Sequence, residues 1–422
     1  MKFFTILLIL IGGIANGQEK LSLDQCYGLL DKNYPLTQQK NLLTQQNTLD
    51  VSVINKGKLP QLDLSVKASY QSDVTAVPVD IPGVVIPSPN KDQYRATVTA
   101  NQLLYNGGLI DAQTQAKNLE TKVKKSSVDV ALYQLRQRIN ALFFSSLIID
   151  EKRQILTDKK TQIKAKLNDL NNAVKYGTAL ASSKAILDAE ILTINQQVFE
   201  IDATKKALLK SLSKLIGTPV NPNVKLQKPL VLWQPKASLK RPELHYFDLQ
   251  KKQIDQQSNI LSKSNKPKIM AFAQGGYGNP GLNLFDKNFA GYYMVGLQLN
   301  WRIFDWQKTK KQRQSLKINQ DIIDNQKEVF KLNTKLENLN QTAEIDAFKE
   351  LVKTDKAIIP LREQVLKTAE AQLKNGLITT SDYLTELTHL YTSKTNLKTH
   401  TLQLEWAKIN YLTTTGNYET SH

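Results

Sequence analysis

The sequence predicts a mainly α-helical protein with a transmembrane β-barrel part, built from two copies of one unit. Three observations support this prediction. Landmarks recur at a fixed separation, one long stretch is free of helix breakers, and short stretches alternate between apolar and polar residues. Each copy is expected to contain a strand hairpin followed by a long antiparallel coiled-coil hairpin of helices, which gives four strands for the chain.

The duplication rests on landmarks that lie 199 residues apart. They are Leu104-Tyr105-Asn106 with Ile303-Phe304-Asp305, Lys175-Tyr176-Gly177 with Lys374-Asn375-Gly376, and Gly217 with Gly416. Each pair alone is weak, but three unrelated marks at one offset indicate an ancestral duplication. The pair Leu59-Pro60 and Lys266-Pro267 is 207 residues apart, so the first copy has about eight extra residues, placed in the Pro-rich loop 77–90.

The longest helices are predicted where helix breakers are missing. Between Leu109 and Lys175 there is no Pro or Gly, and roughly 65 helical residues would extend about 100 Å. From Leu187 to Leu215 apolar residues, interrupted by Lys205, are spaced alternately four and three apart, as in a coiled coil. The helices should fold back at Gly177 and Gly376. In the second copy Pro360 interrupts the long helix and is expected to kink it.

The strands alternate with period two. One face would carry lipid-facing residues, and these are Ala96, Val98, Val295, Leu297 and Leu299. The length and pattern fit a transmembrane barrel strand, although a half-buried soluble hairpin would show the same alternation. Met270 and Phe272 break the alternation of their strand. Because four strands cannot close a barrel, several subunits would have to share one.

The bulk properties narrow the class of protein. Residues 1–17 have the layout of a secretory signal, and no later stretch has 18 consecutive apolar residues. The single Cys26 excludes an internal disulfide. The net charge of +18 is spread along predicted helices, which favours a solvated surface over nucleic-acid binding.

Residues that could carry chemistry are sparse, so no enzyme, cofactor or metal site is predicted. His389 and His400 could share a helix face, but no Cys or carboxylate joins them at ligand spacing. Gly275-Gly276-Tyr277-Gly278 lacks the Lys and the helix of a phosphate loop.

The domain boundaries expected from these patterns follow the chain in order. They are a signal peptide at 1–17, an N-terminal helix at 18–57, a transmembrane hairpin at 58–106, a helical hairpin at 107–216, a Pro-rich equatorial linker at 217–240, a helix at 241–265, a second transmembrane hairpin at 266–305, a second helical hairpin at 306–415 and a tail at 416–422.

The duplicated unit behind a signal sequence resembles the TolC-like outer membrane factor family over essentially the whole mature chain. Local motifs add to the resemblance. They are Lys175-Tyr176-Gly177-Thr178 with Ser182-Ser183, Lys374-Asn375-Gly376-Leu377 with Ser381-Asp382-Tyr383-Leu384, and Leu23-Asp24-Gln25-Cys26 with Asn33-Tyr34-Pro35-Leu36.

The resemblance implies a homotrimer with a twelve-stranded barrel in the outer membrane lipid of a Gram-negative bacterium and a twelve-helix tunnel in the periplasm. It implies an exit duct for a tripartite efflux or type I secretion system, with a periplasmic adaptor (a membrane fusion protein) and an inner-membrane transporter as partners. The adaptor would contact the helix tips, which comprise Tyr176, Gly177, Thr178, Asn375, Gly376 and Leu377.

The resemblance also implies a gate at the periplasmic tips, where the family carries acidic residues. Asp382 stands at one such position, while the related positions are Ser183 and Thr385, so one ring of three Asp would be the whole acidic gate. A helix N-terminal acid favoured by the dipole is the alternative for Asp382. The alternative function is a periplasmic scaffold or adaptor outside the membrane, and the sequence does not indicate the cargo.

Overall fold

The computed structural model describes residues 20–76, 78, 82–83, 87–176, 180–229, 231, 233 and 238–418. The predicted signal peptide therefore lies outside the described residues, as do Gly177 and Thr178. Two compact units form. The first combines residues up to Gln38 with Val128–Pro242 and Val329–His422, and the second combines Gln39–Ser127 with Glu243–Glu328.

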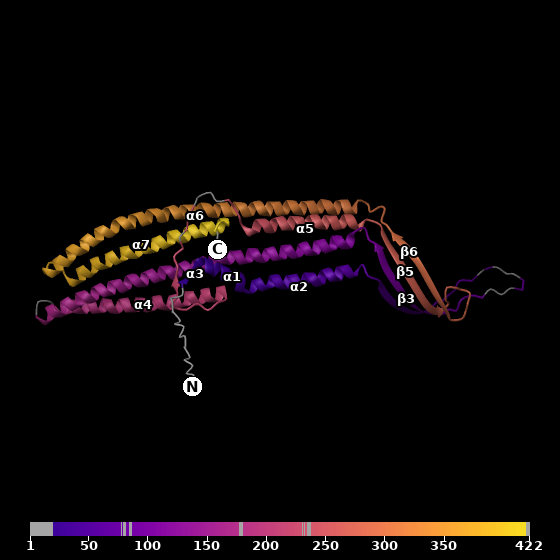
Figure 1. Cartoon of the computed structure of the whole chain (residues 1–422), viewed down its shortest axis with the longest axis horizontal. Coiled ribbons are helices and arrows are strands. Elements are labelled where there is room, and N and C mark those ends of the chain that lie inside the picture. The colour runs from indigo at the N-terminus through magenta and orange to yellow at the C-terminus, as the bar shows by residue number, and fades with distance from the viewer. Residues whose placement is uncertain are drawn as a thin grey trace, which may run out of the picture. The chain divides into compact units, whose positions relative to one another are not determined.

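The described residues form seven helices and six strands, numbered in chain order. Figure 1 labels the helices and the strands β3, β5 and β6. The helices are α1 (Leu23–Asn33), α2 (Pro35–Lys56), α3 (Leu109–Lys175), α4 (Ala181–Ile216), α5 (Pro242–Ser264), α6 (Lys308–Lys374) and α7 (Thr380–Thr415). The strands are β1 (Lys20–Leu21), β2 (Gln61–Tyr70), β3 (Asp92–Tyr105), β4 (Lys225–Leu226), β5 (Lys268–Asn279) and β6 (Ala290–Asn300). None of the described helices combines the length and apolar character needed to span a bilayer.

The element bounds repeat the offset found in the sequence. Both α6 and α7 begin and end 199 residues after α3 and α4. Gly217 and Gly416 end α4 and α7 with φ of 67° and 79°, the left-handed region that favours glycine. A Cβ on Gly416 would lie 2.5 Å from the carbonyl carbon of Lys240, so the close approach also requires glycine.

Two proline residues affect the helices differently. The N-terminal helical segment is split into α1 and α2, because Tyr34 before Pro35 takes an extended ψ of 137°. Pro360 lies inside α6, which continues from Lys308 to Lys374 as one helix. A proline within a helix loses one backbone hydrogen bond, and here the helix tolerates that loss.

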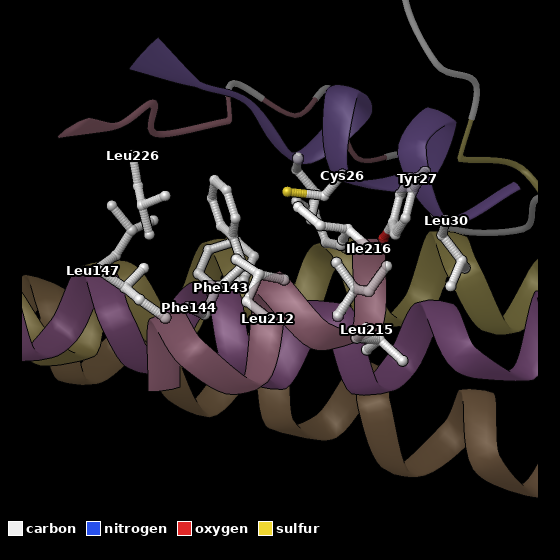
Figure 2. Packing of buried hydrophobic residues seen from close by; sticks show 14 of the residues in the cluster. Cys26, Tyr27, Leu30, Phe143, Phe144, Leu147, Leu212, Leu215, Ile216 and Leu226 are labelled. Atoms are coloured by element: carbon white, nitrogen blue, oxygen red, sulfur yellow. The ribbon is translucent and has the colours of Figure 1, made fainter. Parts of the chain in front are cut away.

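The core of the first unit lies where α1 packs on α3 and α4. Tyr27, Phe143 and Ile216 are fully buried, and Figure 2 shows side chains of α1 facing those of α3 and α4. A capping box between Ser22 and Gln25 starts α1 at this place. Burial raises the pKa of the Cys26 thiol to about 12, so it remains an unreactive thiol inside the core.

A second cluster packs toward the hairpin tips. It contains Ile163 of α3, Leu187 and Ile194 of α4, Leu366 of α6, and Leu387 of α7. Leu187 and Ile194 belong to the apolar series with alternating spacing of four and three. Burial of this series explains why the spacing identified a coiled-coil face in the sequence.

The second unit holds one antiparallel sheet in the order β2-β3-β5-β6. The central pair β3 and β5 joins the two copies, and β3, β5 and β6 lie side by side in Figure 1. Within the described residues the outer edges of β2 and β6 have no strand partner. The sheet is therefore open at both edges.

Candidate functional site

One face of the four-stranded sheet is apolar. The register places Val98 opposite Leu64 on one side and Gly275 on the other, and it places Leu297 opposite Ala271. We define the apolar sheet face by the apolar and Tyr side chains that share this orientation, which they also share with Asp92, Gln102 and Asn279. They are Leu62, Leu64, Val66, Ala68, Tyr70, Tyr94, Ala96, Val98, Ala100, Ile269, Ala271, Ala273, Tyr277, Tyr293, Val295, Leu297 and Leu299. All five residues expected to face lipid lie on it.

The apolar sheet face is exposed in the protomer. Val66 is 74% exposed, Leu297 is 71% exposed and Tyr293 is 80% exposed. A contiguous apolar surface of this extent indicates contact with lipid or with another protein surface. The face therefore requires a cover that the protomer itself does not supply.

The opposite face carries polar side chains together with Leu103, Met270, Met294 and two aromatic rings. Phe272, which breaks the alternation in the sequence, lies opposite Gly296, and a Cβ on Gly296 would meet its ring at 2.7 Å. Tyr292 covers Gly276 in the same way, and its hydroxyl is 2.9 Å from the hydroxyl of Thr97. Each ring fills the space that a glycine leaves on the neighbouring strand.

The junction between β6 and α6 contains two residues in the left-handed region. Trp306 and Gln307 have φ of 52° and 61°, and the residues 199 positions earlier are Gly107 and Gly108 with φ of 68° and 79°. A non-glycine residue pays roughly 1–2 kcal/mol for this conformation. The second copy has the same left-handed backbone conformation as the first, although Trp306 and Gln307 stand in place of the two glycines.

Asp305 stabilises the start of α6 beside this junction. Its carboxylate accepts hydrogen bonds from the backbone N–H of Thr309 at 3.0 Å and from the Asn265 amide at 3.1 Å. Trp306 itself is 86% exposed and packs edge-to-face on Phe304, with ring centroids 4.9 Å apart. Alignment of Trp306-Gln307 with Gly107-Gly108 would have revealed the backbone conformation.

The tip of the second helical hairpin is a compact turn. Gly376 has φ of 72°, and the N–H of Leu377 donates to the carbonyl of Gln372 at 2.9 Å, which closes α6 with a Schellman-type bond. Leu377 is 73% exposed. Asn375, Gly376 and Leu377 thus lie together on an exposed turn.

Asp382 is the N3 residue of α7, and it forms a capping box with the N-cap residue Thr379. Its carboxylate accepts from the Thr379 N–H at 2.9 Å and from the Thr379 hydroxyl at 2.7 Å, and its own N–H donates to that hydroxyl. These bonds from the Thr379 hydroxyl and backbone lower the pKa of Asp382, so the exposed carboxylate is charged at neutral pH.

The tip of the first hairpin differs in its capping. Leu180 occupies the N-cap of α4 without a side-chain hydrogen bond, and the Ser183 N–H donates to the Leu180 carbonyl at 3.1 Å. Tyr176 and Leu180 are 76% and 74% exposed. The two tips have the same length, but only the second one has a side-chain cap at the start of its returning helix.

Two of the three expected gate residues lie together. Asp382 and Thr385 line a groove of about 540 Å³ between α6 and α7, whereas Ser183 is not among its lining residues. Glu386 adds a second carboxylate to this groove and forms an ion pair with Arg362 at 3.4 Å. Sequence reasoning missed Glu386 because nothing in a single helix shows which side chains face a groove.

Buried polar groups fix the helices behind the tip. The Lys159 ammonium, on a residue only 6% exposed, donates to Glu190 at 2.7 Å and to Thr388 at 3.0 Å, which ties α3 to α4 and α7. Farther along, His400 and Asp355 are 2.7 Å apart. His400 thus has a structural partner on α6 in the described part of the chain.

Comparison with protein families gives a match over residues 233–417, which cover α5, β5, β6, α6 and α7, to the family described as outer membrane efflux protein. The chain carries an outer membrane efflux protein domain. The match lies in the second copy and in the linker before it. Comparison with curated protein sequences gives no significant match.

Solved structures of outer membrane proteins share the fold of this outer membrane efflux domain and of the first copy. VceC of Vibrio cholerae has 16% identity, a TM-score of 0.62, and coverage of 92% of this chain and 95% of its own. The MtrE outer membrane channel of Neisseria gonorrhoeae, in its open state, has 15% identity, a TM-score of 0.65, and coverage of 95% and 91%. The CmeC outer membrane channel of Campylobacter jejuni has 15% identity, a TM-score of 0.61, and coverage of 95% and 87%. The resemblance predicted from the sequence is confirmed.

Proposed function

We propose that the chain is the subunit of an outer membrane exit duct in a Gram-negative bacterium. Substrates delivered by an inner-membrane transporter and a periplasmic adaptor would pass through it to the outside, in a tripartite efflux or type I secretion system. The duct performs no bond chemistry. The cargo moves through a water-filled lumen, and the transporter supplies the energy.

The observation that carries this proposal is the sheet of the second unit. One face is apolar and exposed, with Val66 and Leu297 more than 70% exposed, and the other face carries polar side chains. A strand with one lipid face and one wet face is the pattern of a transmembrane barrel. The apolar sheet face is thus assigned to outer membrane lipid.

Closure of the barrel requires further copies of the chain. Four strands are too few to close, and the outer edges of β2 and β6 have no partner in the protomer. Three copies would supply twelve strands. Because the chain is a repeat, we expect β6 of one copy to pair with β2 of the next copy in the same way as β3 pairs with β5 within one copy. Val98 of β3 lies opposite Gly275 of β5, and the repeat offsets of 199 and 207 residues relate these two positions to Leu297 and Ala68. Leu297 is therefore predicted to lie opposite Ala68 of the next copy.

The hairpin tips are proposed to meet the adaptor and to form the gate. The exposed side chains of Tyr176 and Leu377 are available for contact. Asp382 and Thr385, which share one groove, would line the constriction with a ring of three carboxylates. Ser183 would contribute its hydroxyl from the first hairpin. These assignments rest on the exposure of the tips and on the likeness to outer membrane channels.

The duct is tested by reconstituting the purified full-length chain into planar lipid bilayers. Discrete conductance steps are expected, together with flotation of the protein with lipid vesicles. Recovery in the soluble periplasmic fraction without detergent, and bilayers without conductance, would instead indicate a scaffold or adaptor outside the membrane.

A further inference from the structure

The two ends of the sheet in the second unit carry opposite charge. At the end joined to the helices, residues 56–61, 101–113, 263–269 and 300–313 contain ten Lys or Arg and two Asp. At the other end, the described residues of 70–92 and 278–291 contain three Asp and two Lys. The helix-side end is therefore strongly cationic, and the distal end is weakly anionic.

The largest share of this positive charge comes from the first turns of α6. Lys308, Lys310, Lys311 and Arg313 are exposed, and no acidic residue occurs between Asp305 and Asp321. The residues 199 positions earlier in α3 are Leu109, Asp111, Ala112 and Thr114. The cationic turn is a property of the second copy alone, so it does not follow from the shared architecture.

The cations of this turn are not matched by carboxylates of the unit. None of the four forms an ion pair within the described residues, and Arg313 donates to the Ser258 hydroxyl at 3.0 Å. The two Asp residues at this end are engaged elsewhere. Asp111 pairs with Lys58 at 2.6 Å, and Asp305 accepts from Thr309. Asp255 and Asp305 line the same groove as Lys310 and Arg313, so the four cations leave a net positive charge at the turn.

Aromatic side chains lie directly beside the cations. Trp301 is 56% exposed, Phe304 is 67% exposed, and Trp306 is 86% exposed on a backbone held in the left-handed region. Amphipathic rings of Trp favour the level of lipid headgroups, and nearby Lys and Arg bind headgroup phosphates. In the first copy Gly107 stands in place of Trp306.

We propose that Trp306, Lys308, Lys310, Lys311 and Arg313, which we call the junction cluster, bind the headgroups of anionic phospholipids. The lipid would belong to the leaflet that faces the helices, because the cluster lies where β6 ends and α6 begins. This inference rests on the proposed membrane-spanning sheet. It adds a lipid preference that the sheet alone does not require.

Charge complementarity favours an anionic phospholipid over a second copy of the chain as the partner of the junction cluster. The neighbouring copy would bring α2, in which Asp50 is the one acidic residue of Pro35–Lys56. One carboxylate cannot compensate four cations. Phosphatidylglycerol carries a net negative charge in every headgroup and can supply several phosphates at once.

The test uses quenching of tryptophan fluorescence by brominated lipid. The full-length protein is reconstituted in phosphatidylcholine vesicles that contain an equal fraction of either brominated phosphatidylglycerol or brominated phosphatidylcholine. Flotation confirms insertion in each case. The wild-type protein is expected to be quenched more strongly by phosphatidylglycerol, and added salt should reduce the difference.

The decisive variant carries Lys308→Gln, Lys310→Gln, Lys311→Gln and Arg313→Gln together. It should lose the preference for phosphatidylglycerol, with at least roughly a tenfold weaker apparent affinity, since each cation near the surface contributes separately. The matched control removes four exposed cations farther along the same helix, through Lys335→Gln, Lys356→Gln, Lys367→Gln and Lys374→Gln. The control should keep the wild-type preference.

Three outcomes would overturn the inference. Equal quenching of the wild-type protein by both lipids would show that there is no preference. An unchanged preference in the decisive variant would place the lipid site elsewhere. Loss of the oligomer in that variant, measured by light scattering, would assign the junction cluster to contact between copies. Failure of the wild-type protein to float with vesicles would instead overturn the proposed function. The flotation result therefore distinguishes failure of the proposed function from failure of the lipid preference.

Discussion

At the scale of single residues, Asp382 combines a structural role with a proposed functional one. The carboxylate completes the capping box of α7 through two bonds from Thr379, and it also lines the tip groove. The sequence left open a choice between a gate carboxylate and a helix N-terminal acid. The structure shows the helix-terminal role, and the gate role stays a prediction.

We expect Asp382→Ala to raise single-channel conductance in planar bilayers and to reduce cation preference, because it removes a ring of charge from the constriction. Thr379→Ala is the matched control, since it breaks the same capping box and keeps the carboxylate. Its loss of stability should be about 1 kcal/mol. Equal conductance changes in both variants would attribute the effect to fraying of α7, and no change in either would remove Asp382 from the narrowest point.

The glycines that end the helices differ in what surrounds them. Gly416→Ala should destabilise the protein markedly, because its φ is 79° and a Cβ would lie 2.5 Å from the Lys240 carbonyl carbon. Gly376→Ala is the control, with φ of 72° and no atom within 4 Å of the added Cβ. It should cost only the backbone strain of about 1–2 kcal/mol. Thermal unfolding followed by circular dichroism measures both, and equal losses would contradict the close approach at Gly416.

The sequence identified these glycines because they recur 199 residues apart, but it could not identify their contacts. Trp306 and Gln307 are a clearer example of what the sequence does not reveal. Neither residue type favours the left-handed region, so no local signal marks the turn. Only the comparison with Gly107 and Gly108 in the first copy shows that the backbone has been retained.

At the scale of elements, the long helices and the position of β5 were predictable, but the cause of the irregular pattern of β5 was not. The stretch from Leu109 to Lys175 has no Pro or Gly, and α3 occupies it fully. The strand β5 departs from alternation because Phe272 fills the space above Gly296, a contact between strands that a single strand does not reveal. The break at Pro35 was missed because the helical composition continues on both sides of it.

The phase of the strands is tested by placing charge on either sheet face. Val98→Arg and Leu297→Arg should each impair insertion, at a cost of roughly 2–4 kcal/mol if the site lies at the bilayer midplane. The controls Thr99→Arg and Gln298→Arg put the same charge one residue away, on the polar face. The yield of membrane-inserted protein after flotation is the measurement. Normal yield of the first pair would count against the assigned lipid face.

At the scale of the whole molecule, the account depends on how the open sheet is completed. The alternation predicts an amphipathic strand, but it does not say whether the strand edges are paired within one chain or between chains. In the protomer β2 and β6 are the outer strands, three strand spacings apart, which is roughly 14 Å. A pairing between their outer edges must therefore come from another copy.

The most direct measurement is a disulfide cross-link between copies, made in the variant Ala68→Cys/Leu297→Cys. The repeat predicts that these residues lie opposite each other across the closing pair of strands, and the one native Cys26 is fully buried. Oxidation of the membrane-inserted protein should give a covalent trimer on a non-reducing gel. The control Ala68→Cys/Tyr293→Cys, displaced by four residues or roughly 13 Å along the strand, should stay monomeric. A monomer from the first variant, or a cross-link within one chain, would contradict the shared barrel.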